Sequence, residues 1–251
     1  MYRFPPKRQA LVEGETIEYV VAGSGPATVV LVNGSGGPIE GWHRVFGPLA
    51  NVATVFGYNR PGIGGSSKPK VPQRGAQLVA SLRGVLQAAN LTPPYLLVGH
   101  SFGGLIVNLY ARWHPAEVGA VILLEATAPE DLTVLPAHEN RVQRLLRRVM
   151  ERLVPANPNA ETQQTAGIEA EFQGAPAFPP IPLTVVTGGK PAMAWATRPE
   201  ALAARAAHQE RLVHLSPLGK HVVATRSGHF PQFSEPALVV AAVEEAIRVS
   251  R

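Results

Sequence analysis

The chain has 251 residues, of which 45% are apolar, with a net charge of +5 and no cysteine. This length suits one large α/β domain with an insertion better than two independent domains. The lack of cysteine excludes disulfides, thiolate metal sites and a cysteine nucleophile. A basic chain can bind nucleic acid or an anionic membrane. Here the Lys and Arg residues are mostly scattered and no basic run is interleaved with aromatic residues, so we expect no nucleic-acid binding.

No apolar run approaches the roughly 18 residues needed to cross a bilayer, so we expect no membrane span. The basic N-terminus is not followed by an apolar segment of signal-peptide length, which favours a cytoplasmic protein. A mature chain whose signal peptide has been removed would look the same.

Apolar patterning predicts alternating strands and helices. In chain order, we expect strands over 16–21, 28–32 and 52–58, a helix over 73–89, a strand over 95–98, a helix over 102–114 and a strand over 118–124. The order resumes with a strand over 183–187, a helix around 200–215, a strand over 222–225 and a helix from about 235 to 249. The apolar run 28–32 is typical of a strand buried on both faces. The alternation predicts a parallel sheet covered on both sides.

Between residues 126 and 180 the alternation stops. This stretch is rich in Pro, Gln, Asn and Thr, and its clearest element is an amphipathic helix over 138–153. The five arginines of the stretch all lie on that helix, but the stretch also contains seven acidic residues. This balance of charge favours a solvated surface over a membrane contact. We divide the single domain into a core of residues 1–125 and 181–251 and a cap insertion of residues 126–180. An insertion here would lie over the carboxyl ends of the strands, where open α/β sheets bind ligands.

A Gly-x-Ser-x-Gly pattern, Gly99-His100-Ser101-Phe102-Gly103, separates an apolar strand from a helix. A serine on such a sharp turn stands clear of the sheet, and the flanking glycines relieve crowding. The helix N-terminus behind it favours developing negative charge. The structural alternative is a glycine-rich turn with an N-capping serine. The strand before and the helix after favour Ser101 as a nucleophile.

This GHSFGG motif, with VNGSGGP, YNRPGIGGSS and SGHFPQFSEP, resembles the α/β-hydrolase superfamily over roughly residues 12–125 and 180–250. The resemblance implies an α/β fold with an eight-stranded, mostly parallel sheet flanked by helices. It also implies a triad in the chain order Ser, acid, His. The proposed helical cap would follow the strand that ends near Leu124.

The general base is predicted to be His229, the only one of eight histidines between the last predicted strand and the last helix. Its SGHF context resembles the family's histidine loop. An imidazole suits the role because the serine hydroxyl must lose a proton near neutral pH. We expect His100 to pack, and His43 is a candidate substrate contact. The others have no metal-ligand spacing and are interpreted as structural: His114, His138, His208, His214 and His221.

The acid is less obvious. The family usually places it just after the strand at 183–187, but that turn reads Gly188-Gly189-Lys190-Pro191. Another location used in the superfamily is the end of the strand after the nucleophile helix, where Glu125 stands. An unpaired carboxylate is costly to bury there, whereas beside His229 it would fix the imidazole tautomer and stabilise the imidazolium. We predict Glu125 as the acid. The alternatives are a strand-end glutamate without a catalytic role, a dyad without an acid, and the carboxylates Glu130, Asp131 and Glu200.

The glycine-rich loop of residues 33–37 (NGSGG) stands where the family carries His-Gly-x-Gly, with Asn33 in place of histidine. The resemblance implies the backbone N–H groups of Ser35 and Phe102 as oxyanion donors, with Gly34 in the same loop. Such donors are worth roughly 10²–10³ in rate each.

Three further positions are open to two interpretations. A dinucleotide loop is disfavoured because Ile39 occupies the third glycine position of the nucleotide motif and no acidic residue follows about twenty positions on. Trp42 is either a packing residue or part of the substrate pocket. Asn59 replaces the aspartate of the family's Asp-Arg-x-Gly-x-Gly-x-Ser turn, which we interpret as structural.

The sequence predicts a serine hydrolase that cleaves a carboxylic ester or related acyl bond of a small molecule through an acyl-serine, without a metal or organic cofactor. Acyl transfer, perhydrolysis, C–C hydrolysis and lyase chemistry on the same fold are alternatives. A non-catalytic ligand-binding protein is the alternative from another class, kept open by the displaced acid and by Asn33. Dehalogenase or epoxide hydrolase chemistry is disfavoured, since those relatives need a carboxylate where Ser101 stands.

Overall fold

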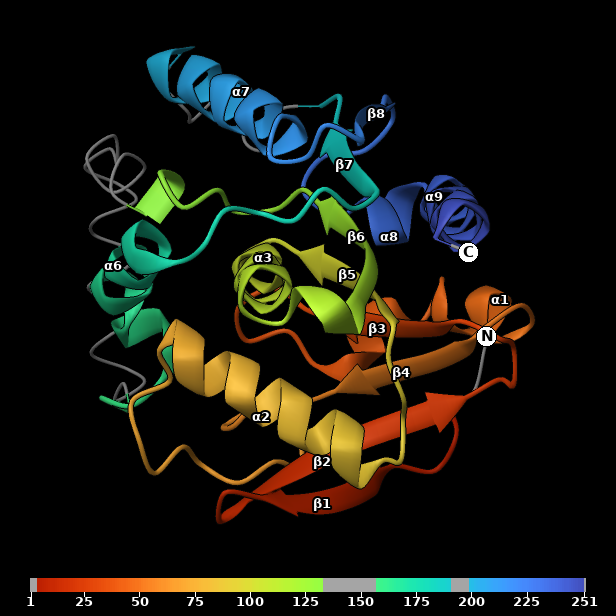
Figure 1. The fold of residues 1–251 in the computed structure, drawn as a ribbon, viewed down its shortest axis with the longest axis vertical. Coiled ribbons are helices and arrows are strands. Elements are labelled where there is room, and N and C mark those ends of the chain that lie inside the picture. Colours follow the sequence, from red (N-terminus) through yellow and green to blue (C-terminus); the bar gives the residue numbers. More distant parts are fainter. Residues whose placement is uncertain (1–3, 133–156, 191–198, 251) are drawn as a thin grey trace.

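The computed structural model describes residues 4–132, 157–190 and 199–250 (Figure 1). One eight-stranded sheet has the order β1-β2-β4-β3-β5-β6-β7-β8. Its strands are β1 Arg8–Val12, β2 Glu15–Ala22, β3 Thr28–Val32, β4 Thr54–Tyr58, β5 Tyr95–His100, β6 Val118–Leu124, β7 Leu183–Gly188 and β8 Gly219–Ala224. β2 is antiparallel to both neighbours, and the strands from β4 to β8 pair in parallel. The expected eight-stranded, mostly parallel sheet is confirmed.

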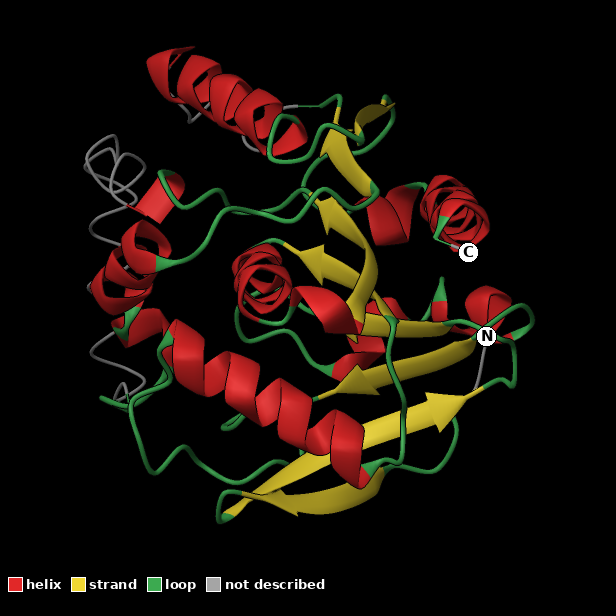
Figure 2. Ribbon diagram, viewed as in Figure 1, coloured by secondary structure: helices red, strands yellow, loops and turns green. Residues whose placement is uncertain are grey.

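Helices cover both faces of the twisted sheet (Figure 2). One face carries α2 Gly75–Ala88, α3 Phe102–Trp113 and α7 Pro199–Val213, and the other carries α1 Phe46–Ala50 and α9 Pro236–Val249. The shorter elements are η1 Ile39–Trp42, η2 Pro115–Glu117, η3 Glu161–Gln163, α6 Thr165–Gly174 and α8 Pro231–Ser234. In β3, Val30 and Val32 pack into one core and Val29 and Leu31 into the other. This strand is buried on both faces, as its continuous apolar run predicts.

Each predicted strand or helix within the described residues overlaps an observed element, with bounds that differ by at most three residues. The predicted helix over 138–153 lies outside them. Among the described residues, two kinds of element were missed: the strand or α-helices β1, α1, α6 and α8, and the short 3-10 helices η1, η2 and η3. β1 is a sheet-edge strand that buries only Val12 fully, and α6 buries only Ile168, so neither has a pronounced apolar pattern.

Within the predicted cap insertion of residues 126–180, η3 and α6 lie beside the N-terminal end of α2 (Figure 1). Glu171 in α6 fixes this contact, because its Oε1 accepts a hydrogen bond of 3.2 Å from the Ala76 N–H in the first turn of α2. The insertion therefore contacts the core through a carboxylate at the start of a core helix, a favourable place for negative charge.

The parallel strands β3, β5, β6, β7 and β8 are neighbours, so their carboxyl ends meet at one edge of the sheet. The loops that follow them carry the glycine-rich loop 33–37, Ser101, Glu125, Gly189 and His229. Segments far apart in the sequence are thereby brought to the edge where open α/β sheets bind ligands.

Candidate active site

Ser101 occupies the turn between β5 and α3 with φ 51° and ψ −122°. A positive φ is unusual for a residue with a Cβ and is held only by its surroundings. The two motif glycines supply that tight packing. A Cβ on Gly103 would lie 2.2 Å from the Val32 carbonyl oxygen, and one on Gly99 would lie 2.6 Å from the Gly103 carbonyl oxygen. Only glycine allows α3 to approach the end of β3 this closely, which fixes Ser101 at the helix N-terminus.

His229, in the segment between β8 and α8, joins Ser101 to Glu125. Its Nε2 is 3.0 Å from the Ser101 Oγ, and its Nδ1 is 3.3 Å from Oε2 of Glu125. Glu125 follows the last residue of β6 and is 6% exposed. The structure thus brings together the three residues that the sequence singled out as nucleophile, base and acid.

Glu125 accepts two further hydrogen bonds. The Gly188 N–H donates to Oε1 at 2.6 Å, and Arg205 Nη2 donates to Oε2 at 2.7 Å. Burial opposes ionisation, but the hydrogen bond with His229, the charge of Arg205 and the Gly188 N–H outweigh it and lower the pKa of Glu125 to about 2. The carboxylate is therefore ionised at neutral pH. Gly188, at the end of β7, stands just before the turn where the family usually carries the acid. Here it donates a hydrogen bond to Glu125, which follows β6.

The tautomer of His229 follows from these partners. An ionised carboxylate can only accept hydrogen bonds, so Nδ1 of a neutral His229 carries the proton and donates to Glu125. Nε2 is then left as an acceptor facing the Ser101 hydroxyl. This arrangement can remove a proton from the serine.

The alternative carboxylates have other surroundings. Asp131 hydrogen-bonds to the ring of His208 and accepts the Ala128 N–H at 2.8 Å. Glu130 lies 3.7 Å from Arg211, and Glu200 is exposed in the first turn of α7. Among the carboxylates considered as the acid, Glu125 is the one placed beside the His229 ring.

The glycine-rich loop 33–37 lies against the serine, because a Cβ on Gly34 would be 3.1 Å from the Ser101 Cβ. Two amide side chains hold it where the family has histidine and aspartate. Asn33 Nδ2 donates to the Pro38 carbonyl at 2.5 Å, and Asn59 Oδ1 accepts the Ile39 N–H at 2.8 Å. Both asparagines therefore hydrogen-bond to the backbone just after the loop.

The two predicted oxyanion donors come from different segments: Phe102 follows the serine directly, and Ser35 belongs to the glycine-rich loop. Phe102 is the first residue of α3, so its N–H has no acceptor within the helix. Ser35 is exposed within the glycine-rich loop. Their role in binding an oxyanion stays a prediction.

Two buried side chains, His100 and Trp42, lie behind the catalytic candidate His229. His100 is 3% exposed, and its Nε2 is 2.8 Å from the His229 carbonyl oxygen. Burial lowers its pKa to about 4, so the ring is neutral near pH 7 and donates from Nε2. Trp42 is buried edge-on to His100, with ring centroids 6.4 Å apart. His43 lies on the ring of Phe233 at 5.5 Å. Substrate contacts of Trp42 and His43 stay predictions.

Three residues of this region had no recognisable sequence signal. Arg205 lies on a charged helix, Arg60 lies in a turn that was interpreted as structural, and Glu161 lies in the insertion, where the family resemblance is weakest. Arg60 and Glu161 form a buried ion pair at 2.6 Å. Only the folded chain identifies these partners, because each pair joins segments far apart in sequence.

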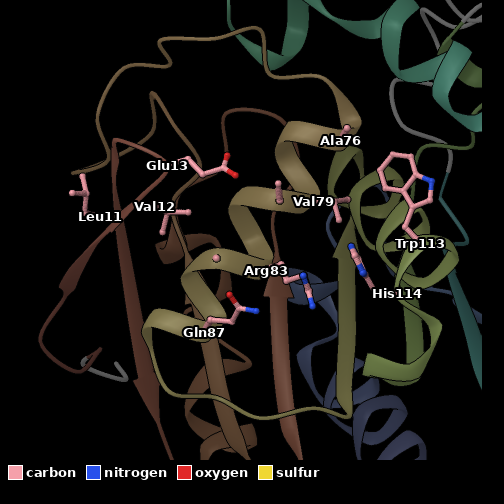
Figure 3. A pocket seen from close by; sticks show the side chains of 11 residues that line it. Leu11, Val12, Glu13, Ala76, Val79, Arg83, Gln87, Trp113 and His114 are labelled. Carbon is pink, nitrogen blue, oxygen red and sulfur yellow. The ribbon is translucent and has the colours of Figure 1, made fainter.

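A cavity of about 670 Å³ lies elsewhere, between the β1–β2 turn, α2 and the end of α3 (Figure 3). Trp113 and His114 line it at the C-terminal end of α3, whereas Ser101 caps the N-terminal end. A helix of 12 residues is about 18 Å long, so this cavity is separate from the serine. Its cation, Arg83, is paired with Glu117 at 2.7 Å.

Within residues 4–132, 157–190 and 199–250, no three His, Cys, Asp or Glu side chains are grouped so that they could hold a metal ion. No helix in the same ranges has the length and apolarity to cross a membrane.

Comparison with known proteins identifies the family. The sequence model of the α/β hydrolase fold matches residues 27–180, more than half of the chain. The chain belongs to this family. The match extends from β3 into the insertion and includes the serine turn, and the resemblance seen in the motifs is confirmed.

Among curated proteins, the uncharacterized protein YqjL of Bacillus subtilis is 33% identical over 103 residues, or 41% of each chain. The chain thus aligns with less than half of this relative's length. Among solved structures, a putative lipase from Acinetobacter baumannii has a TM-score of 0.72 at 21% identity, covering 97% of this chain and 91% of that one. The enol-lactonase from Burkholderia xenovorans has a TM-score of 0.68 at 18% identity, covering 96% and 100%. These likenesses show the fold.

Proposed function

We propose that the protein is a serine hydrolase that cleaves a carboxylic ester or related acyl bond of a small molecule through an acyl-serine intermediate. The observation that carries this proposal is the hydrogen-bonded series Ser101–His229–Glu125, with distances of 3.0 and 3.3 Å, on a strained turn at a helix N-terminus. These three residues form the catalytic triad. Covalent catalysis requires a nucleophile within hydrogen-bond reach of a base, and the base is in turn oriented by a third group.

In the first half of the reaction, the Ser101 oxygen attacks the substrate carbonyl carbon while Nε2 of His229 takes the hydroxyl proton. Glu125 stays ionised and stabilises the imidazolium without taking a proton itself. The negative charge that develops on the carbonyl oxygen is bound by the N–H groups of Ser35 and Phe102. When the tetrahedral intermediate collapses, His229 returns the proton to the leaving alcohol and the acyl group remains on Ser101.

In the second half, His229 takes a proton from water, and the resulting hydroxide attacks the acyl carbonyl. The ester bond to Ser101 breaks, the carboxylic acid leaves and the serine regains its proton from His229. The cycle uses water and groups of this chain alone.

Residues 126–180 are the cap of this site in our proposal. The supporting observation is that Glu161, in η3, reaches the glycine-rich loop beside Ser101, where Oε1 accepts the Gly36 N–H at 3.2 Å. The names of two solved relatives of similar fold, a putative lipase and an enol-lactonase, are compatible with the proposed chemistry.

The test uses a small alkyl fluorophosphonate, which phosphonylates an activated serine whatever its natural substrate. Wild type and Ser101→Ala are incubated with the probe, and their intact masses are measured. We expect one adduct on wild type and none on Ser101→Ala, with Ser66→Ala as a control that labels like wild type. A folded wild-type protein that forms no adduct would contradict the proposal and favour a ligand-binding protein.

A further inference from the structure

Two charged side chains that the proposed chemistry does not use are paired beside the serine. Arg60, in the turn after β4, and Glu161, in η3 of the insertion, are 1% and 9% exposed. Arg60 Nε donates to Oε2 of Glu161 at 2.6 Å, and Nη2 donates to Oε1 at 2.9 Å. A two-pronged pair of this kind fixes the relative orientation of both groups.

Several other contacts of the pair go to the glycine-rich loop, while Arg60 also interacts with Tyr58 and lies 5.8 Å from the centre of the Phe102 ring. Arg60 Nη1 donates to the Asn33 carbonyl at 2.8 Å, and Nη2 donates to the Gly34 carbonyl at 2.6 Å. From the other side of the pair, Glu161 accepts the Gly36 N–H at 3.2 Å and a hydrogen bond from the Ser35 side chain. The loop is thus bound through its carbonyls by the cation and through its donors by the anion.

The peptide between Gly34 and Ser35 connects this pair to the proposed chemistry. In a trans peptide the carbonyl oxygen and the N–H point in opposite directions. The Gly34 carbonyl accepts hydrogen bonds from Arg60 Nη2 and, at 3.1 Å, from the Gly37 N–H, so the Ser35 N–H is turned away from Arg60. The same peptide lies against the serine, since a Cβ on Gly34 would be 3.1 Å from the Ser101 Cβ.

We propose that Arg60 and Glu161 are positioning residues that aim the Ser35 N–H at the oxyanion. This inference rests on the proposed function. It adds that the insertion supplies part of the oxyanion-binding machinery, because one member of the pair belongs to η3. The pair itself does not touch the reacting atoms, so it acts on the transition state through the loop.

The main variant is Glu161→Gln, which keeps the size of the side chain and an oxygen acceptor but removes the charge that holds Arg60. Arg60→Lys is the second variant, since it keeps the charge and loses the two-pronged geometry. Glu171→Gln is the matched control. Glu171 also joins the insertion to the core through a backbone N–H, at 3.2 Å, but its partner Ala76 lies in α2 and outside the glycine-rich loop.

Hydrolysis of p-nitrophenyl butyrate is measured for each protein, and reactive serines are counted by fluorophosphonate labelling carried to completion. We expect kcat per labelled serine to fall roughly 10–100-fold in Glu161→Gln and Arg60→Lys, because small displacements of a catalytic group have effects of this size. KM should stay within about threefold, since the loss concerns the transition state. Glu171→Gln should match wild type within about threefold on the same scale.

The outcomes separate the two proposals. A wild type that labels and hydrolyses, with both pair variants retaining kcat per labelled serine, overturns the positioning role alone. Loss of labelled serines with unchanged kcat per site has the same meaning, because it shows that the pair only stabilises the fold. A wild type that neither labels nor hydrolyses overturns the proposed function and this role with it.

Discussion

Two buried carboxylates bind the groups around Ser101, and each also binds an arginine, yet their surroundings differ. Glu125 shares its Oε2 between Arg205 and the titratable ring of His229, and the Arg205 side chain is 26% exposed. Glu161 binds Arg60, which is 1% exposed, and the pair also bonds to the backbone and to the Ser35 side chain within residues 33–36. Arg60 further contacts Tyr58 and the Phe102 ring. Both carboxylates have a lowered pKa.

The difference shows that the third partner decides what a buried ion pair can do. A carboxylate that also contacts an imidazole can respond to proton transfer, because the charge of the ring changes during the reaction. The Arg60–Glu161 pair has no imidazole among its partners, which are peptide groups, the Ser35 side chain and Tyr58. Burial raises the pKa of Tyr58, so this phenol stays neutral near pH 7 and the pair serves to fix geometry. Substitutions on the Glu125 side should therefore affect proton transfer, whereas those on the Glu161 side should affect stability and the aim of one N–H group.

The largest effect is expected for Glu125→Gln. The amide keeps the shape of the side chain but cannot stabilise the imidazolium and can hold the wrong tautomer of His229, so turnover should fall roughly 10³–10⁴-fold. Hydrolysis of p-nitrophenyl butyrate at neutral pH measures this loss. Glu130→Gln, at a partly exposed carboxylate beyond β6, is the control and should stay near wild type. A folded Glu125→Gln protein that loses less than about tenfold would remove Glu125 from the triad.

The next effect concerns stability on the other side of the serine. Arg60→Met leaves the buried charge of Glu161 unpaired, which should lower the free energy of unfolding by about 3–5 kcal/mol. The double variant Arg60→Met/Glu161→Met has no unpaired charge and should recover part of that loss. Urea unfolding measures both. If the double variant is less stable than Arg60→Met alone, the desolvation argument for this pair is wrong.

A smaller effect is expected at His100, which connects the serine turn to the histidine loop. Its pKa is about 4 in the folded protein against 6.5 ordinarily, because the buried ring resists protonation. Between these values the unfolded chain binds more protons than the folded one. The stability contributed by the neutral ring is therefore complete above pH 6.5 and is lost as the pH falls towards 4.

Acidification from pH 7 to pH 5 should lower the free energy of unfolding by roughly 2 kcal/mol through this residue. His100→Gln does not titrate and keeps a donor for the His229 carbonyl, so its loss over the same range should be smaller by that amount. Urea unfolding at the two pH values measures the difference. Parallel losses in the two proteins would mean that His100 is not held neutral by the fold.

The same comparison explains what the sequence could predict. Ser101 and Glu125 directly follow strands with continuous apolar runs, and His229 is the one histidine between the last predicted strand and the last helix. The topology of parallel strands therefore predicts that the three residues meet at one edge. Arg60 also follows an apolar strand, β4, but the sequence gives no sign of its partner. Glu161 lies in η3, which has three residues and belongs to a stretch without periodicity. Arg205 lies on a helix with several other charges, and only the packing of α7 near the end of β6 selects it.

The smallest effect, and the sharpest contrast with Glu125, is expected for Arg205→Met. Arg205 also approaches the Glu125 carbonyl oxygen at 3.4 Å, so it stabilises a turn in which Glu125 has φ 45°. Glu125 keeps the hydrogen bonds of His229 and of the Gly188 N–H when the arginine is removed, and a partly exposed ion pair contributes little. We therefore expect turnover to fall by no more than about tenfold. Arg211→Met, on the same helix and 53% exposed, is the control.

Turnover of Arg205→Met is compared with that of Glu125→Gln under the same conditions. A loss as large as that of Glu125→Gln would show that the arginine and the carboxylate act as one unit. The contrast drawn between the two ion pairs would then fail, since both arginines would be needed to hold the groups that surround Ser101.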